Sequence, residues 1–462
     1  MKKQLSLTRR QFLKTSAATA GGCALSAVHP FSLPLPAGAR RKKALVFIML
    51  DGGNDSFNML VPVSGPHYRE YRETRSNLAL DRKTLLDLDG GEDRQGRRFG
   101  VHPAMPEVRR LFNRKKLAFI ANTGPLVDPV DSRSFHSGRA GLPLGLFSHA
   151  DQIRHWQTVQ ADRRVEHGWF GRLADRMQPE VTRQMIPMNI SLAGANIIQR
   201  GRVASPYCIT EKGSVGLVVN EADTPLNRSL VRSFENLLTR AYPDDPFKQT
   251  YLGLTRDAQA RHRIFKAATD NISVPGSFSD SPLSRSLKQV AGTIRGPADP
   301  EIPGQTFYLR YIGWDHHDEL LKNHERMLGI LSRALGDFQD ALDAMGLADR
   351  VVTFIGSDFG RTLTSNGNGT DHGWGGNALI MGGPVQGGQV TGEYPSLALG
   401  ESNPLDAGDG AVIPTLPIDL VYEKMARWFG AGERDIADIL PNLSRFRRMP
   451  EPSGLGNLIA GA

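Results

Sequence analysis

An apolar run that leads directly into an acidic residue constrains the fold of this chain most. Val351 to Ile355 is a short stretch of β-branched and aromatic residues, and Asp358 follows it closely. Such a continuous run is typical of a buried strand in a parallel sheet. The Gly- and Asn-rich segment 365–370 then predicts a loop, which returns Asp371 and His372 to the same sheet edge. Open α/β sheets bind ligands at the carboxyl ends of their strands, so this edge is the first candidate for a functional site.

Three further apolar runs, at residues 44–50, 117–122 and 305–312, also predict core strands. A helical pattern that begins near Pro103 connects the first two runs. Apolar residues at alternating spacings of three and four between Leu328 and Met345 predict a long helix between the third run and the strand described above. The chain therefore contains two predicted βαβ units, which are typical of α/β proteins with a mostly parallel sheet.

Several acidic or imidazole side chains fall at or beside the predicted carboxyl edge. They are Asp51, Asp315, His317, Asp358, Asp371 and His372. A single Asp at a strand end is usually a turn residue or a helix N-cap, but here separate segments converge on one edge. Carboxylates combined with imidazoles are ligands for divalent ions, and a pair of ions can bind both the attacking and the leaving oxygen of an ester. The residue types therefore predict a divalent metal site, with Zn²⁺, Mn²⁺, Ca²⁺ and Mg²⁺ as the candidates.

The first residues predict export. Thr8 to Lys14 contains the paired Arg9 and Arg10 of a twin-arginine signal, and the small residues Ala37 to Ala39 resemble a cleavage site. We therefore expect the twin-arginine translocase as an export partner, and a periplasmic or secreted location. The apolar part of this segment is too short to remain as a membrane span, so no transmembrane segment is expected in the mature chain. Cys23, preceded by two glycines, is an alternative site of lipid attachment.

Composition narrows the class of the mature protein. Removal of residues 1–39 takes away five basic residues and no acid, so the formal net charge falls from +8 to +3. This balance gives no reason to expect nucleic-acid binding. Cys208 is then the only cysteine, which excludes an internal disulfide and leaves stability to a large hydrophobic core. We expect residues 40–462 to form a single α/β domain with helical and loop insertions at about 227–303.

Three segments carry a resemblance to a known family: residues 45–62, 146–158 and 357–388. The second reads LFSHADQIRHWQT, and the third begins SDFGRTLTSNGNGTDHGWGG. Through them the chain resembles the bacterial domain of unknown function 1501 family, which in turn resembles the alkaline phosphatase and sulfatase superfamily. The resemblance implies an alkaline phosphatase-like α/β/α sandwich with a doubly wound sheet and metal ligands on the loops at the strand ends.

The resemblance also suggests roles for individual residues. Asp51 corresponds to the superfamily's first metal-binding Asp, Asp315 and His317 correspond to a later acid and histidine pair, and His372 corresponds to its terminal histidine. Ser148 stands where the superfamily has its nucleophile at the start of a helix, although the same residue also reads as an ordinary N-cap. Weaker alternatives for the nucleophile are Ser132, Ser134 and Ser137.

One departure from the superfamily pattern concerns Phe359. The superfamily has an Asp-His pair after this strand, whereas this chain has Asp358 followed by Phe359. A phenyl ring cannot coordinate a metal, so one ligand is missing unless His316, His149 or His372 supplies it from elsewhere.

The expected function is that of an exported, metal-dependent hydrolase of phosphate or sulfate esters. Arg361 and His149 are the predicted substrate-binding residues. The Arg361 guanidinium can bind an anionic group through a bidentate fork, although an Arg at this place is as often paired with a neighbouring carboxylate. The expected substrate is a small-molecule or polysaccharide ester. The alternative is a non-catalytic envelope or binding protein that keeps the fold with a degenerate metal site, and Phe359 favours this alternative.

Overall fold

The computed structural model describes residues 42–178, 186–216, 224–296 and 302–462. The chain divides into residues 1–40 and a compact unit at residues 41–462. The expected export signal at 1–39, with Arg9, Arg10 and Cys23, lies outside the described residues. No helix among the described residues combines the length and the apolar character that a membrane span requires.

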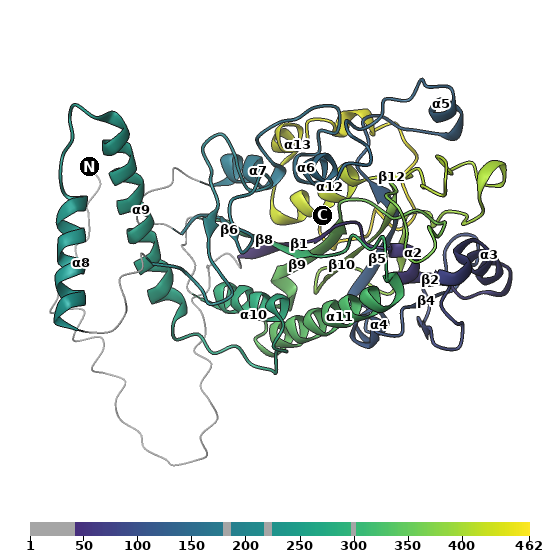
Figure 1. Ribbon diagram of the computed structural model, residues 1–462, viewed down its shortest axis with the longest axis horizontal. Coiled ribbons are helices and arrows are strands. Elements are labelled where there is room, and N and C mark those ends of the chain that lie inside the picture. Colours follow the sequence, from purple (N-terminus) through teal and green to yellow (C-terminus); the bar gives the residue numbers. More distant parts are fainter. Residues whose placement is uncertain (1–41, 179–185, 217–223, 297–301) are drawn as a thin grey trace, which may run out of the picture. The chain divides into compact units, whose positions relative to one another are not determined.

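A mostly parallel sheet forms the centre of the fold (Figure 1). Its strands lie in the order β11-β5-β10-β9-β1-β8-β6-β7, and β12 pairs with β5. Their bounds are β1 Lys43–Asp51, β5 Leu117–Gly124, β6 Asn189–Ser191, β7 Tyr207–Cys208, β8 Gly304–Ile312, β9 Val351–Ser357, β10 Gly376–Gly382, β11 Val390–Thr391 and β12 Leu416–Pro417. Among the described strands of this sheet, only β10 is antiparallel to its neighbours. The predicted α/β fold with a mostly parallel sheet is therefore confirmed.

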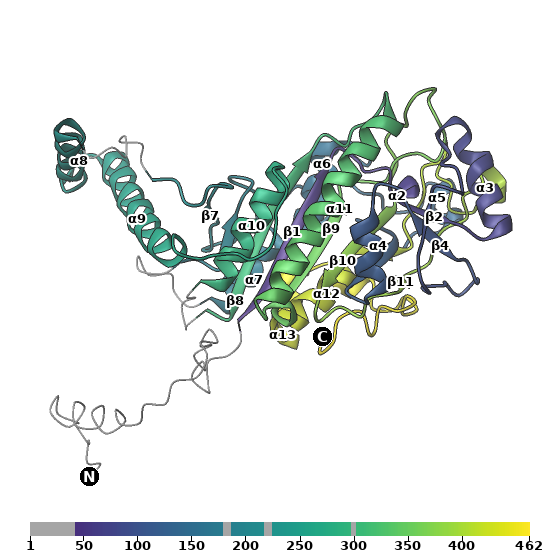
Figure 2. The same cartoon turned by 90° about the horizontal axis from the view of Figure 1, so that it is seen from below.

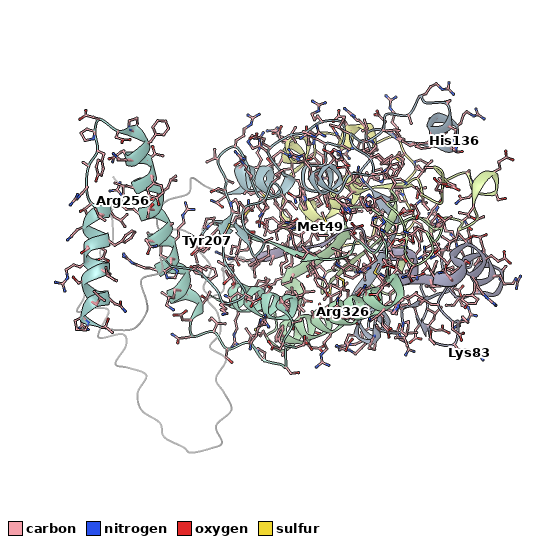
Figure 3. The ribbon with its side chains drawn as sticks, viewed as in Figure 1. Met49, Lys83, His136, Tyr207, Arg256 and Arg326 are labelled. Atoms are coloured by element: carbon pink, nitrogen blue, oxygen red, sulfur yellow. The ribbon has the colours of Figure 1, made fainter. Side chains whose placement is uncertain are left out.

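Helices cover both faces of the sheet, as Figure 2 shows. One face carries α4 (Pro106–Asn113), α10 (Pro282–Arg295) and α11 (Leu320–Ala344), and the other carries α6 (His149–Thr158), α7 (Trp169–Met177), α12 (Ile418–Phe429) and α13 (Glu433–Ile439). Side chains alternate along a strand, so β1 supplies both layers. Val46 and Ile48 pack in the first core, whereas Phe47 and Met49, the latter labelled in Figure 3, pack in the second. Burial on both faces explains why the strand is a continuous apolar run rather than an alternating one.

The two predicted crossovers determine which strand ends become neighbours. α4 is the last element of the long connection from β1 to β5, and α11 connects β8 to β9. β1 lies between β8 and β9 and is parallel to both. The carboxyl ends of these three strands therefore lie together at one sheet edge, which is where the sequence predicted the site.

Two elements were not predicted. β10 follows the Gly-rich loop, which contains no helix, and an antiparallel neighbour needs no crossover helix. The segment 227–303, where helical and loop insertions were expected, also contains α10, which packs on the sheet. Leu283, Leu287 and Val290 form the buried face of α10, and its N-cap Ser281 accepts a hydrogen bond from the backbone N–H of Ser284 at 3.1 Å. The amphipathic spacing of this helix was obscured by the Gly, Ser and Pro residues around it.

The rest of that segment forms two exposed helices, α8 (Pro225–Leu238) and α9 (Pro246–Thr269). Within them only Leu238 and Phe265 are buried. Phe265 packs against Tyr207 of β7, which Figure 3 labels, with ring centroids 5.4 Å apart. The remaining elements are β2 Leu60–Pro62, β3 Leu86–Asp87 and β4 Phe99–Val101 in a small separate sheet, the short helices α2 Ser56–Met59, α3 Gly65–Arg75 and α5 Ser132–His136, and the 3-10 turns η1 Ser76–Leu78, η2 Ala348–Arg350, η3 Gly400–Ser402 and η4 Leu443–Arg445.

Candidate functional site

A histidine, an aspartate and a second histidine form the centre of the candidate site. The Nε2 atom of His149 lies 3.4 Å from the Oδ2 atom of Asp315, and the Nε2 atom of His372 lies 3.4 Å from the Oδ1 atom of the same carboxylate. One ligand atom from each of the three residues lies within 4.8 Å of the other two. We call these three residues the trio. Each comes from a different segment: α6, the loop after β8, and the loop that joins β9 to β10.

Asp358 fixes the orientation of His149. Its Oδ1 atom accepts hydrogen bonds from the backbone N–H groups of Gly52 and Gly53, at 3.2 and 2.5 Å. Its Oδ2 atom lies 2.6 Å from the Nδ1 atom of His149. The opposite ring nitrogen, Nε2, is buried and has no hydrogen-bond partner. A histidine held through one nitrogen by a carboxylate, with its other nitrogen free, is a common arrangement for a metal ligand.

His317 and Asp371 extend the site toward solvent. The Nδ1 atom of His317 lies 3.0 Å from the Oδ1 atom of Asp371, and its Nε2 atom lies 3.0 Å from the Oδ1 atom of Asp315. The same Nε2 atom lies 3.0 Å from the Nε2 atom of His372. His372 is held on its other side by the carbonyl oxygen of Phe147, 2.8 Å from Nδ1. Three imidazoles and two carboxylates therefore lie in direct contact in this part of the site.

The environment shifts the pKa values of the trio in different directions. The hydrogen bond to Asp358 raises the pKa of His149 above its usual value. Burial lowers the pKa of His372. Burial alone would raise the pKa of Asp315, but the hydrogen bond and charge of Arg361, together with the nearby histidines, outweigh it and lower that pKa. At neutral pH, Asp315 is therefore an anion and His372 is a neutral imidazole, which are the forms that bind a divalent ion.

Arg361, predicted to bind substrate, is buried and holds the site together. Its Nη1 atom donates to the Oδ1 atom of Asp315 at 2.6 Å and lies 3.4 Å from the carbonyl oxygen of Gly52. Its Nε atom donates to the Thr370 hydroxyl at 3.1 Å, and its Nη2 atom donates to the Thr370 carbonyl oxygen. The side chain thus connects the loops after β1, β8 and β9. Its donors are used within the protein.

The Asp51 carboxylate, predicted as the first metal ligand, forms an ion pair with Arg310 of β8. The Asp51 carbonyl oxygen accepts hydrogen bonds from the backbone N–H groups of Gly313 and Trp314, at 3.1 and 3.2 Å. These bonds attach the loop that carries Asp315 to the end of β1. Asp51 therefore lies next to the loop that carries Asp315. Its carboxylate is paired with Arg310, a cation that the sequence did not suggest.

Phe359 lies among the imidazoles of the site. Its ring centroid is 4.7 Å from that of His149 and 4.7 Å from that of His372. Of the residues considered as replacements for the missing ligand, His149 and His372 are in the trio. His316 is buried, both of its ring nitrogens lack a hydrogen-bond partner, and burial lowers its pKa to about 4.

Ser148, the predicted nucleophile, is the N-cap of α6. Its hydroxyl oxygen accepts a hydrogen bond from the backbone N–H of Asp151 at 3.5 Å. It stands between two residues that contact the site, His149 and Phe147. The cap role and a position beside the trio are thus combined in one residue.

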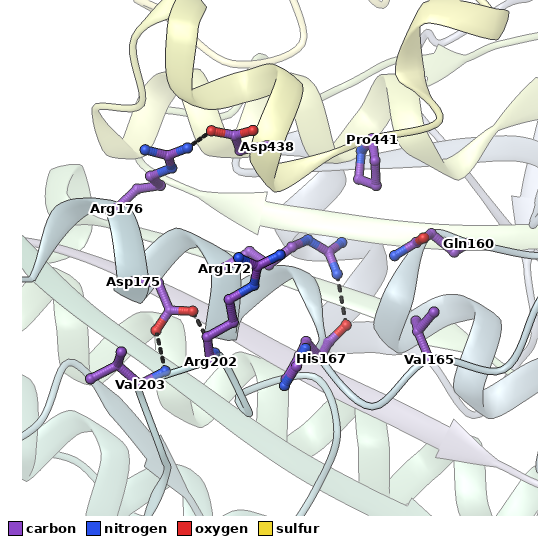
Figure 4. A pocket seen from close by; sticks show the side chains of 10 residues that line it. All are labelled: Gln160, Val165, His167, Arg172, Asp175, Arg176, Arg202, Val203, Asp438 and Pro441. Atoms are coloured by element: carbon purple, nitrogen blue, oxygen red, sulfur yellow. Dashed lines mark hydrogen bonds and ion pairs between the residues drawn. The ribbon is translucent and has the colours of Figure 1, made fainter.

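A cavity of about 570 Å³ lies away from the trio, between α7 and α13 (Figure 4). Gln160 on its wall follows the end of α6, whereas His149 begins that helix, and ten residues of helix span about 15 Å. Both of its carboxylates have partners: Asp438 pairs with Arg176, and Asp175 accepts a hydrogen bond from the Arg202 backbone N–H at 2.6 Å. Among the described residues, the trio is the one group of three acid and imidazole side chains close enough together to hold a metal ion.

Sequence comparison connects the strand-end site with a family. Residues 304–412 match the family model "Protein of unknown function (DUF1501)". This DUF1501 match contains Asp315, His317, Asp358, Arg361, Asp371 and His372, whereas Asp51, Ser148 and His149 lie before it. Residues 6–26 match the "TAT (twin-arginine translocation) pathway signal sequence". The signal match confirms the predicted export to the periplasm or the exterior. A search of curated proteins found no match.

Distant similarities to solved structures were also found. The crystal structure of Ps i-CgsB in complex with k-i-k-neocarrahexaose is 11% identical with a TM-score of 0.32, over 87% of this chain and 76% of that chain. The 2-O GAG sulfatase BT1596 is 12% identical with a TM-score of 0.27, over 75% and 65%. A mutant of the alkaline phosphatase PafA is 13% identical with a TM-score of 0.24, over 70% and 64%.

Sequence reasoning missed Arg310. It is the single charged residue of β8, whose other positions are polar or apolar, and it stands near the carboxyl end of the strand. A lone cation in a core strand, a few residues before an acid and a histidine, is a signal that was available in the sequence. The pairing of β1 with β8, which brings Arg310 to Asp51, could not be read from the sequence.

Proposed function

We propose that this exported protein is a metal-dependent hydrolase of phosphate or sulfate esters. The observation that carries the proposal is the trio, in which a buried imidazole nitrogen without a hydrogen-bond partner faces a carboxylate and a second imidazole. The donor set fits a divalent ion, because two imidazoles and a carboxylate are frequent ligands of catalytic Zn²⁺ and of related ions. His149, Asp315 and His372 would hold the ion, and His317 would be a fourth ligand.

The surrounding residues have distinct roles in this proposal. Asp358 orients His149, and Asp371 orients His317, as carboxylates do behind metal-bound histidines. Arg361 positions Asp315. A bound divalent ion would polarise the ester and lower the pKa of a nearby hydroxyl.

Ser148 is the proposed nucleophile, and Arg310 is the proposed contact for the ester anion. The first backbone N–H groups of α6 follow Ser148, and a helix N-terminus stabilises an anionic group next to it. Arg310 is about two-fifths exposed, so its guanidinium is accessible to a ligand, unlike that of Arg361. Asp51 would then balance the Arg310 charge when no substrate is bound.

The test is metal analysis of protein purified from the periplasm, combined with assays on p-nitrophenyl phosphate and p-nitrophenyl sulfate. We expect a near-stoichiometric divalent ion and turnover of at least one ester. Asp315→Asn should lose both. Asp318→Asn, an isosteric change at an exposed acid on the same loop, should lose neither.

A second candidate function is a binding protein without catalysis, and the place of Phe359 against both histidines of the trio favours it. Absence of both metal and turnover in the parent protein would refute the hydrolase and leave this candidate. Bound metal without turnover of any ester would reject catalysis while keeping the metal site.

A further inference from the structure

A large cavity lies at the same sheet edge as the trio. Its volume is about 920 Å³. Its walls come from the segments after β6 and β7, the last residues of β8, and the start of α10. β6, β7 and β8 are parallel, so these segments all lie at carboxyl ends of strands. α10 ends at Arg295 shortly before β8 begins at Gly304, so its first residues lie at the opposite, carboxyl end of β8. Figure 1 shows α10 beside β8.

The cavity exists because β8 is longer than its neighbour. The last pairing of β6 joins Ser191 to Tyr308, and β8 continues to Ile312. Beyond Tyr308, the described part of the chain places no strand on that side of β8. The resulting notch is as large as the binding sites of drug-sized molecules, which are roughly 300–1,000 Å³.

The walls of the notch are mainly apolar. Their apolar side chains include Leu192, Ile209, Leu283, Leu309, Ile312 and Ile330. Ile312 is 66% exposed, which is unusual for an isoleucine on a core strand. Among the charged lining residues, Glu211 accepts a hydrogen bond from Arg285 at 3.1 Å. Arg310 is the one that contacts Asp51 at the end of β1.

Arg310 connects the notch to the candidate site. It lines the notch, and its guanidinium contacts the Asp51 carboxylate at the end of β1. Three residues after Ile312, the same strand end supplies Asp315. An ester with its anionic group between Arg310 and the trio would therefore direct its organic group into the notch.

We infer that the substrate is a phosphate or sulfate ester of a large, mainly apolar alcohol, and that the notch binds this alcohol. The inference rests on the proposed hydrolase function. A sugar ring would bring many hydroxyl groups against Leu283, Leu309 and Ile330, and a buried hydroxyl without a partner is costly. An aryl or alkyl group gains from the same surface. The class of substrate is thus an aryl or alkyl ester rather than a polysaccharide ester.

The experiment compares two phosphonates that contain no hydrolysable ester, 1-naphthylmethylphosphonate and methylphosphonate, by isothermal titration calorimetry on the mature protein. We expect the naphthyl compound to bind at least about tenfold more tightly, because it removes apolar area from water. Ile312→Asp should abolish most of this preference. Because the new carboxylate lies two residues from Arg310 and repels both anions, the readout is the ratio of the two affinities. Val203→Asp is the matched control, since Val203 is 80% exposed and lies outside the notch, and it should change neither affinity.

The outcomes separate the two proposals. Equal affinity for the two phosphonates, or a naphthyl preference that survives Ile312→Asp, overturns the inference even if p-nitrophenyl esters are hydrolysed. A naphthyl preference that Ile312→Asp removes supports the notch even if no ester is hydrolysed, in which case only the hydrolase function fails. Circular dichroism of Ile312→Asp checks its fold, which an exposed position should preserve.

Discussion

Replacement of Arg361 by glutamine should destabilise the whole protein, because this side chain connects three loops of the site. It loses the hydrogen bonds to the carbonyl oxygen and hydroxyl of Thr370 and the contact with Asp315. Asp315 is 44% exposed, so that ion pair contributes at most about 1 kcal/mol. The two bonds to Thr370 are buried, and each contributes about 1–1.5 kcal/mol. The expected loss in the free energy of unfolding is therefore about 2–4 kcal/mol.

Urea unfolding followed by circular dichroism, with a chelator present, measures this loss without a contribution from bound metal. The matched control is Arg333→Gln, because Arg333 forms an exposed ion pair with Asp337 on α11, with its Nε atom 3.0 Å from an Asp337 oxygen. That pair should contribute below about 0.5 kcal/mol. If Arg361→Gln costs no more than Arg333→Gln, the guanidinium does not hold the loops together and the reasoning is wrong.

Three further predictions concern single groups. Burial raises the pKa of Asp419 from its usual 3.8 to about 7, so the folded protein keeps a proton that the unfolded chain loses. The free energy of unfolding should therefore fall by up to about 4 kcal/mol as the pH rises from about 4 to about 7. Asp419→Asn should flatten this pH dependence of the urea midpoint, and an unchanged slope would contradict the prediction. Phe359→His places an imidazole between the two histidines of the trio and should tighten Zn²⁺ binding at least about tenfold in calorimetric titrations; an unchanged Kd would show that the ring does not occupy a ligand position. The raised pKa of His149 means that its pair with Asp358 stabilises metal-free protein fully below about pH 6.5 and is lost as pH rises through the folded pKa. Metal binding must displace this proton, so the Zn²⁺ Kd should weaken as pH falls through that range. His149→Asn should make this dependence shallower in calorimetric titrations, and an unchanged slope would contradict the prediction.

The central strands could be predicted because their residue types indicate burial. β1 and β9 are apolar at successive positions, which only burial on both faces allows. The prediction that Asp315 and Asp358 meet at one edge followed from the strand ends, and the prediction that His372 joins them followed from the Gly- and Asn-rich loop before it. β10 escaped prediction because its direction depends on the missing crossover helix, which is a property of the connection and not of the strand.

The role of His149 could not be read from its neighbours in sequence. Its ring is aimed by Asp358, a residue far away in the chain, and α6 is held over the strand end by Trp156, which donates to the Asp358 carbonyl oxygen at 2.8 Å. The same is true of Arg361, which was predicted to bind the substrate anion. Tertiary packing buried it and used its donors. A single sequence does not show the role of a side chain when that role depends on contacts with residues far away in the chain.

The position of β1 between β8 and β9 has a consequence for biosynthesis. β1 is complete after residue 51, but its partners end at residues 312 and 357. About 300 more residues must therefore be synthesised before both neighbours of β1 are present. At roughly 5–20 residues per second, this delay is about 15–60 s. During that time the twin-arginine signal has already left the ribosome while the first strand has no partner. A chaperone that shields this strand, or delayed recognition of the signal, would keep the transporter from receiving an unfinished sheet.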